Sequence, residues 1–243
     1  MNGYRKENKY IVDESVLQEV QNRITPLMQI DPHQKGDHYS IRSIYLDSPD
    51  YRSFRENLAG TSPREKLRIR IYNGDSSKIS AEVKIRHRET ISKLSADISR
   101  DTLDAIVHND LARLPELILK DMESEKNSKE TKKKALEKYM MYIMGEGYAP
   151  ACMVNYERCA YVYNPCNVRI TFDRNVETTR NYAGFFCDTL PAIPVFEHGM
   201  HVLEVKYDEF LPDVLQETLG GVLPPRTNCS KYANSILRIQ GNV

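Results

Sequence analysis

Several stretches of this sequence alternate long charged side chains with aliphatic ones, and this alternation limits the folds open to the chain. In residues 66–72 (KLRIRIY), Lys66, Arg68 and Arg70 are separated by single Leu or Ile residues. Successive side chains of a β-strand point to opposite faces of the sheet. The segment therefore predicts a strand with one cationic face and one apolar face.

The strand pattern recurs along the chain. Segments rich in Ile, Val and Tyr with polar alternation predict eight strands, at 5–12, 39–47, 66–72, 79–88, 91–98, 154–163, 168–173 and 201–207. Helical periodicity predicts helices at 13–28, 99–119, 128–144 and 230–239. We expect one domain over residues 1–243, with a helical insertion at about 99–147 between two groups of strands.

The charged faces need a physical explanation. An antiparallel sheet with one wet face would explain any single strand, but at least five strands place charged side chains on one face. Like charges on neighbouring strands repel each other, so an anion that neutralises them is expected. Arg and Lys suit phosphate oxygens. Interspersed carboxylates, at Glu7, Glu82 and Glu204, would suit a divalent cation that bridges the phosphates.

A closed sheet would bring these charges together. We predict an α+β fold with a closed eight-stranded antiparallel β-barrel, whose charged faces line the lumen and whose apolar faces lie outward under the helices. An eight-stranded barrel leaves room for side chains or one slim ligand. A linear phosphate chain is slim and highly anionic.

Composition argues against several other classes. The 34 basic and 34 acidic residues balance, so there is no global reason to expect nucleic acid or a membrane surface as partner. The apolar runs are too short for a membrane span, and the first residues do not resemble a secretory signal. Five cysteines without a CxxC pair are expected to be reduced thiols in a cytoplasmic protein. The six histidines lack metal-site spacing.

The ordered series of strand segments is also recognisable. It consists of RKENKY at 5–10, SIYLDS at 43–48, KLRIRIY at 66–72, EVK at 82–84, NYER at 155–158, RITFD at 169–173, LEVKY at 203–207 and SKY at 230–232. From about residue 4 to 240 this series resembles the VTC domain, the polyphosphate polymerase branch of the CYTH-like triphosphate tunnel metalloenzymes. The resemblance implies a tunnel, a divalent metal (Mn or Mg), and transfer of the ATP γ-phosphate onto growing inorganic polyphosphate.

The resemblance also implies roles for individual residues. Catalytic cations are implied at Arg68, Arg70, Lys84 and Arg158. Phosphate-binding residues are implied at Lys9, Lys206, Ser230 and Lys231, with Arg169 and Tyr45 as further positions and Asp173 as another residue of the lumen. Glu204 is implied as the metal-binding carboxylate, and Glu7 and Glu82 are further candidates for that role.

Alternative functions remain open at this stage. Hydrolytic members that resemble this fold usually begin with Glu-x-Glu-x-Lys, whereas Arg5 stands here at the first acidic position. This departure favours binding of a phosphate chain over hydrolysis. A triphosphatase that cleaves tripolyphosphate or a nucleoside triphosphate, and a non-catalytic polyphosphate-binding module, are the alternatives. The expected partners are ATP and polyphosphate, and a membrane protein beside the enzyme is a further possible partner.

Overall fold

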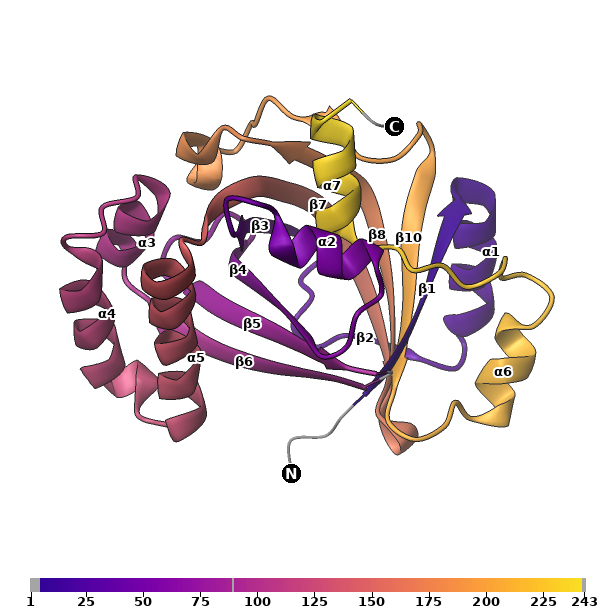
Figure 1. Ribbon diagram of the computed structural model, residues 1–243. Coiled ribbons are helices and arrows are strands. Elements are labelled where there is room, and N and C mark those ends of the chain that lie inside the picture. Colours follow the sequence, from indigo (N-terminus) through magenta and orange to yellow (C-terminus); the bar gives the residue numbers. More distant parts are fainter. Residues whose placement is uncertain (1–4, 89, 242–243) are drawn as a thin grey trace.

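The computed structural model describes residues 5–88 and 90–241, and its main feature is a large antiparallel sheet (Figure 1). Eight strands follow one path, in the order β1 (Lys6–Asp13), β10 (Met200–Tyr207), β8 (Val168–Thr179), β7 (Ala149–Tyr163), β3 (Tyr39–Asp47), β4 (Arg64–Tyr72), β5 (Ile79–His87) and β6 (Thr90–Ile98). Two short strands extend it, because β2 (Gln29–Ile30) pairs with β7 and β9 (Ile193–Pro194) pairs with β8. All eight predicted strands are confirmed.

The two strands at the ends of this path come together at one point. Within the described residues, Arg5 and Ile91 form an isolated bridge, with N···O distances of 3.5 and 3.3 Å, and no ladder joins β1 to β6. The strands diverge from there (Figure 1), as expected for the edges of a strongly twisted sheet. The sheet is therefore curled, and the predicted closure into a complete barrel is not confirmed.

Helices cover the outer, apolar face of the curled sheet. Between β6 and β7 the chain forms α3 (Arg100–Val107), α4 (Leu114–Glu123), the 3₁₀ turn η1 (Glu125–Asn127), α5 (Glu130–Met140) and the π-helical turn η2 (Met141–Gly145). These elements pack against the aliphatic residues of β4, β5 and β6. The prediction of one continuous helix at 99–119 is wrong, because two helices, α3 and α4, occupy this region. Helix α3 ends at Val107, and Asn109 adopts a left-handed conformation with φ 55°.

A second apolar layer lies over the other half of the sheet. There α1 (Glu14–Ile24) and α6 (Asp213–Leu219) cover β1, β10 and β8. The alternation places Leu203 and Val205 of β10 in this outer layer and leaves Glu204 on the inner face. The expectation that the apolar faces point outward under helices is thus confirmed.

Two helices close one end of the curl. Helix α2 (Arg52–Leu58) and helix α7 (Lys231–Ile239) lie side by side above the concave face (Figure 1). Asp47, at the end of β3, accepts hydrogen bonds from the backbone N–H groups of Ser53 (2.8 Å) and Phe54 (3.0 Å) in α2 and from the hydroxyl of Tyr232 in α7. One buried carboxylate therefore ties both helices to the sheet.

The remaining turns complete the description. They are the 3₁₀ turns η3 (Asn164–Cys166) and η4 (Tyr182–Phe186). All five cysteines are unpaired. Within the described ranges, no helix is long and apolar enough to pass through a lipid bilayer.

Candidate functional site

The inward faces of the strands and the start of α7 enclose a narrow cavity. It is lined by eight cationic side chains, two carboxylates, one serine and three tyrosines: Lys9, Lys66, Arg68, Arg70, Lys84, Arg158, Lys206, Lys231, Glu7, Glu204, Ser230, Tyr45, Tyr156 and Tyr232. These residues come from both ends of the chain and from the middle strands. We call this space the central cavity. It contains more positive than negative charge, and that charge lies largely out of contact with solvent.

Glu204 of β10 lies among four cations. Its Oε1 is 3.0 Å from Lys231 Nζ and 3.5 Å from Lys9 Nζ, and its Oε2 is 2.8 Å from Lys206 Nζ and 3.5 Å from Arg158 Nη2. Burial alone would raise the pKa of Glu204, but the charges of Lys206, Lys231 and Lys9 outweigh burial and hold the pKa well below its usual value. Glu204 is therefore an anion at neutral pH.

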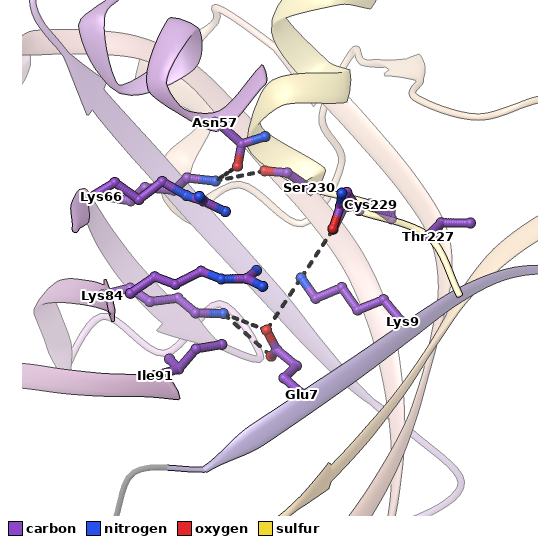
Figure 2. A pocket seen from close by; sticks show the side chains of 12 residues that line it. Glu7, Lys9, Asn57, Lys66, Lys84, Ile91, Thr227, Cys229 and Ser230 are labelled. Carbon is purple, nitrogen blue, oxygen red and sulfur yellow. Dashed lines mark hydrogen bonds and ion pairs between the residues drawn. The ribbon is translucent and has the colours of Figure 1, made fainter. Parts of the chain in front are cut away.

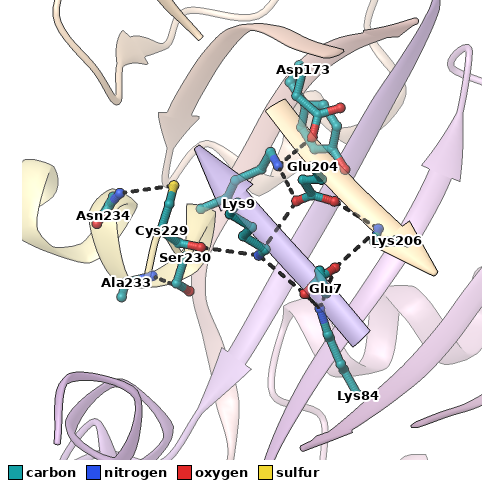
Figure 3. A network of polar contacts seen from close by, with 12 residues as sticks. Glu7, Lys9, Lys84, Asp173, Glu204, Lys206, Cys229, Ser230, Ala233 and Asn234 are labelled. Carbon is teal, nitrogen blue, oxygen red and sulfur yellow. Dashed lines mark hydrogen bonds and ion pairs between the residues drawn. The ribbon is translucent and has the colours of Figure 1, made fainter. Parts of the chain in front are cut away.

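A second carboxylate, Glu7 of β1, shares two of these cations. Lys9 is 3.6 Å from Glu7 Oε2 and Lys206 is 3.2 Å from Oε1, while Lys84 donates to Oε2 at 2.9 Å. Figure 3 shows Lys9 and Lys206 between Glu7 and Glu204. Burial would raise the pKa of Glu7, but Lys84, Lys9 and Lys206 lower it well below its usual value. The cavity thus holds two ionised acids linked by shared ammonium groups.

Glu82 of β5 is placed differently. It is 1% exposed and faces Arg68 directly across the strand pair, with Arg68 Nη2 and Lys93 Nζ at 2.7 and 2.8 Å from its oxygens. Burial would raise the pKa of Glu82, but Arg68, Arg70 and Lys93 together lower it strongly. Glu82 therefore holds Arg68 in position and does not line the central cavity.

Asp173 of β8 plays a similar part for two other cations. Arg158 contacts both its oxygens, with Nε to Oδ1 at 2.5 Å and Nη2 to Oδ2 at 2.7 Å, and Lys231 Nζ is 2.5 Å from Oδ2. The carboxylate of Asp173 is fully buried. A bidentate pair of this kind fixes the plane of the guanidinium, so Asp173 orients Arg158 and Lys231 toward the cavity.

Arg70 of β4 has neutral hydrogen-bond partners, unlike the cavity cations that pair with Glu7, Glu204, Glu82 or Asp173. Its Nε donates to Ser43 Oγ at 3.0 Å and its Nη2 donates to Tyr156 Oη at 3.1 Å. It is 5% exposed, and no carboxylate among the described residues lies within salt-bridge distance of it. A buried guanidinium without a counterion is costly unless an anion binds. Arg70 is therefore a strong candidate ligand for phosphate.

The cavity widens at one end into a larger pocket of about 770 Å³. Arg169 lies here, where its Nη2 donates to Tyr39 Oη at 3.0 Å and contacts Asp31 at 2.8 Å. Tyr39 and Tyr72 also line this pocket, with ring centroids 6.1 Å apart. We call it the wide pocket. Arg169 can contact a ligand there but does not line the central cavity.

The structure therefore brings most of the predicted residues together. The central cavity contains Lys9, Tyr45, Arg68, Arg70, Lys84, Arg158, Lys206, Ser230, Lys231, Glu7 and Glu204. Glu82 lies behind Arg68, and Arg169 lies in the wide pocket. Three cavity residues were not predicted: Lys66, which the strand alternation places on the charged face, and Tyr156 and Tyr232, whose packing resembles that of ordinary core tyrosines. The roles of all these residues stay predictions.

The acids provide only part of a metal site. Among the described residues, no group of three or more His, Cys, Asp or Glu side chains could hold a metal ion. Glu204 and Glu7 are ionised and face the same cavity, as ligands for a hard divalent cation must be. Mg²⁺ and similar ions are often held by one or two carboxylates plus substrate phosphates. The residues present fit a metal that enters together with a phosphate ligand.

Comparisons with known proteins extend these observations. A family model, the VTC domain, matches residues 4–239. A search of curated proteins found no significant match. Among solved structures, the chain is similar to the PH1819 protein of Pyrococcus horikoshii OT3, with 14% identity, a TM-score of 0.47 and coverage of 98% of this chain and 99% of that one. The PH1012 protein of the same organism gives 14% identity, a TM-score of 0.48 and coverage of 96% and 99%.

Proposed function

The chain belongs to the VTC domain family, and we propose that it is a polyphosphate polymerase that transfers the γ-phosphate of ATP onto a growing chain of inorganic polyphosphate. One observation supports this proposal above the others. The central cavity presents eight cations against two carboxylates, and most of these side chains are buried or half-buried. Glu82 and Asp173, behind the lining, offset part of this excess, and an anion of high charge in the cavity would offset the rest.

The shape of the cavity favours a linear polyanion. The cavity is narrow, and its cations follow successive inward positions of β4 and neighbouring strands. Arg68, Arg70 and Arg158 supply guanidinium groups suited to phosphate oxygens, and the lysines supply point charges. Tyr39 and Tyr72 in the wide pocket offer aromatic surface for the base of a nucleotide. In this proposal the curled sheet functions as a tunnel around the phosphates, and its two edges meet at the Arg5–Ile91 bridge.

Phosphoryl transfer makes few chemical demands on the protein. Catalysis depends mainly on positioning and on stabilising the charge that spreads over the transferred group. In our proposal Arg68, Arg70, Lys84 and Arg158 neutralise that charge. A terminal oxygen of orthophosphate or polyphosphate forms the new P–O bond, and the bond to the leaving ADP breaks. The attacking oxygen is already ionised, so a general base is not required.

The acids and the metal complete the proposal. Glu204, with Glu7 beside it, would hold a divalent cation, which would neutralise charge on the phosphate oxygens. Glu82 and Asp173 keep Arg68 and Arg158 in place. These two acids are thus positioning residues, because they act through the guanidinium groups.

Incubation of the protein with ATP and Mn²⁺ tests the proposal. We expect long-chain polyphosphate on a gel, and no polymer from an Arg70→Met variant. Lys129→Ala is a matched control, because it removes one exposed cation that does not line the cavity. Free orthophosphate without polymer would instead support a triphosphatase. Tight binding of polyphosphate with neither product would support a binding module and would refute the polymerase.

A further inference from the structure

Asp47 is a buried carboxylate that does not line the central cavity. It lies at the end of β3 and is 3% exposed. Four groups donate hydrogen bonds to it: the backbone N–H groups of Ser48 (2.8 Å), Ser53 (2.8 Å) and Phe54 (3.0 Å), and the hydroxyl of Tyr232. All four donors are neutral. A buried carboxylate needs donors of this kind to satisfy its oxygens, so Asp47 and the segments that supply them are held together.

One of these segments, α7, is preceded by chain without regular structure. Residues 224–230 form neither helix nor strand, and α7 has only nine residues. The place of its first turn is therefore set by contacts with the rest of the protein. Tyr232 is the second residue of α7. Its bond to Asp47 is thus a contact that fixes the first turn of the helix directly to the sheet.

The same turn carries two residues of the central cavity. Ser230 and Lys231 immediately precede Tyr232, and all three line the cavity. Lys231 Nζ lies 2.5 Å from Asp173 Oδ2, and Ser230 Oγ accepts a hydrogen bond from Lys66 Nζ at 2.9 Å. Small displacements of groups that contact a ligand weaken those contacts strongly. A shift of the first turn would therefore disturb both residues at once.

Asp47 also reaches the cavity through the other helix. Asn57 lies in the last turn of α2, and its Oδ1 accepts a hydrogen bond from Lys66 Nζ, which also donates to Ser230 (Figure 2). The ammonium of Lys66 therefore bridges α2 and α7, the two helices that Asp47 ties to the sheet. This ammonium also lies 5.9 Å from the centroid of the Tyr232 ring.

We propose that Asp47 and Tyr232 are positioning residues of the phosphate site. Tyr232 acts through Ser230 and Lys231, and Asp47 acts through both helices. The single proton of the Tyr232 hydroxyl goes to Asp47, so this hydroxyl does not donate to phosphate. Asp47 does not line the cavity, so it fixes the helices without competing with phosphate for their cations. This inference rests on the proposed function, because it takes the central cavity as the site of the phosphates.

The affinity of a Tyr232→Phe variant for tripolyphosphate tests the proposal. The change keeps the ring and removes only the hydroxyl. Calorimetry well below the melting temperature should show an affinity about fivefold lower at unchanged stoichiometry, the loss equivalent to one hydrogen bond. A hydroxyl with a purely structural role would lower the melting temperature and the fraction of molecules that bind, and the folded molecules would keep the wild-type affinity.

Tyr161→Phe is the matched control. Tyr161 lies on the outer face of β7, is 5% exposed, and accepts a hydrogen bond from Gln21 Nε2 at 3.0 Å. Its replacement removes one hydroxyl of a buried tyrosine that does not line the central cavity. The affinity for tripolyphosphate should therefore stay unchanged. An equal loss of affinity in Tyr161→Phe and Tyr232→Phe would overturn the proposal.

A double-mutant cycle shows whether the hydroxyl acts through the first turn of α7. In a background of Ser230→Ala and Lys231→Met, Tyr232→Phe should lower the affinity by less than about twofold, because the residues it positions are gone. If thermal unfolding shows that this background is not folded, Ser230→Ala alone replaces it, and the loss should then be smaller than in the wild type. No loss in the wild type, or the same loss in both backgrounds, would refute the positioning role.

The failure of the proposed function would look different. If the wild type did not bind tripolyphosphate, both the positioning role and the polymerase would fall. If it bound tripolyphosphate and made no polymer from ATP, the polymerase alone would fall, and the cycle would still decide the role of Tyr232. If it made polymer and Tyr232→Phe bound like the wild type, the positioning role alone would fall.

Discussion

Replacing Glu204 by Gln should make the folded protein depend on an added anion. The change removes the charge that Lys9, Arg158, Lys206 and Lys231 share, at contacts of 2.8–3.5 Å. Breaking a buried ion pair by removing one partner costs about 3–5 kcal/mol. Asp173 still contacts Arg158 and Lys231, and Glu7 still contacts Lys9 and Lys206, so we expect the lower end, about 3 kcal/mol.

That loss can be measured by thermal unfolding at neutral pH. For a chain of this size, about 3 kcal/mol corresponds to a fall in melting temperature of about 6–12 °C. Tripolyphosphate at about 100 times its dissociation constant stabilises a folded protein by about 2.7 kcal/mol. It should therefore restore most of the loss in Glu204→Gln without any metal.

The control is Glu137→Gln, which removes an exposed acid on α5. It should change neither the melting temperature without anions nor the stabilisation that tripolyphosphate provides. If Glu204→Gln and the wild type had the same melting temperature in the absence of anions, the reasoning would be refuted. The stability of the four buried cations would then not depend on the Glu204 carboxylate. A loss of stability that tripolyphosphate cannot restore would refute the view that the cavity accepts a phosphate chain.

Three further outcomes are expected. Arg70→Met should weaken tripolyphosphate binding at least tenfold in calorimetry, as expected for the loss of charge-assisted hydrogen bonds. Its effect on the free energy of unfolding should be small, because removing a buried guanidinium without a counterion offsets the loss of its two hydrogen bonds to Ser43 and Tyr156. Tyr232→Phe should lower the free energy of unfolding in urea by about 1–2 kcal/mol, since it removes a hydrogen bond to the buried carboxylate of Asp47. The free energy of unfolding should fall as the pH drops below about 4.5, because the pKa values of Glu7 and Glu82 are lower in the folded protein than in the unfolded chain. In a Glu7→Gln variant the free energy of unfolding, measured by acid titration, should fall less steeply. An equally steep fall would contradict the stabilising role of ionised Glu7.

Alternation along the sequence was sufficient to predict the faces of the strands. Lys66, Arg68 and Arg70 point inward while the aliphatic residues between them enter the outer core, because a strand has a fixed period of two. The same period placed Glu204 on the inner face of β10. The α+β class and the cluster of cations are therefore direct consequences of local pattern.

The pairing and register of the strands could not be predicted in this way. The registers of β1 with β10 and of β4 with β5 place Lys9 opposite Glu204 and Arg68 opposite Glu82. Such pairings decide which acid is a counterion and which could reach a metal. By strand alternation alone Glu82 was as good a candidate metal ligand as Glu204, yet it lies behind Arg68 because of the β4–β5 register.

Two helices were missed for a related reason. Helix α2 has only seven residues and follows Tyr51, which has a left-handed conformation and provides no side-chain cap. Its first N–H groups are satisfied by Asp47, which lies outside the helix at the end of β3. The signals that define this helix are therefore tertiary. Helix α6 is equally short, and its first residue follows Pro212 without a side-chain cap.

The central cavity joins the two ends of the chain. Lys9 near the start donates to the carbonyl of Cys229 at 3.1 Å, and its own carbonyl accepts from the N–H of Thr227 at 2.9 Å. Contacts that span more than 200 residues form slowly, since a long loop must close first. A chain in which the middle strands have already paired therefore still lacks a complete cavity until the segment around Cys229 contacts Lys9. Under the proposed function, affinity for phosphate chains should arise only after this late contact forms.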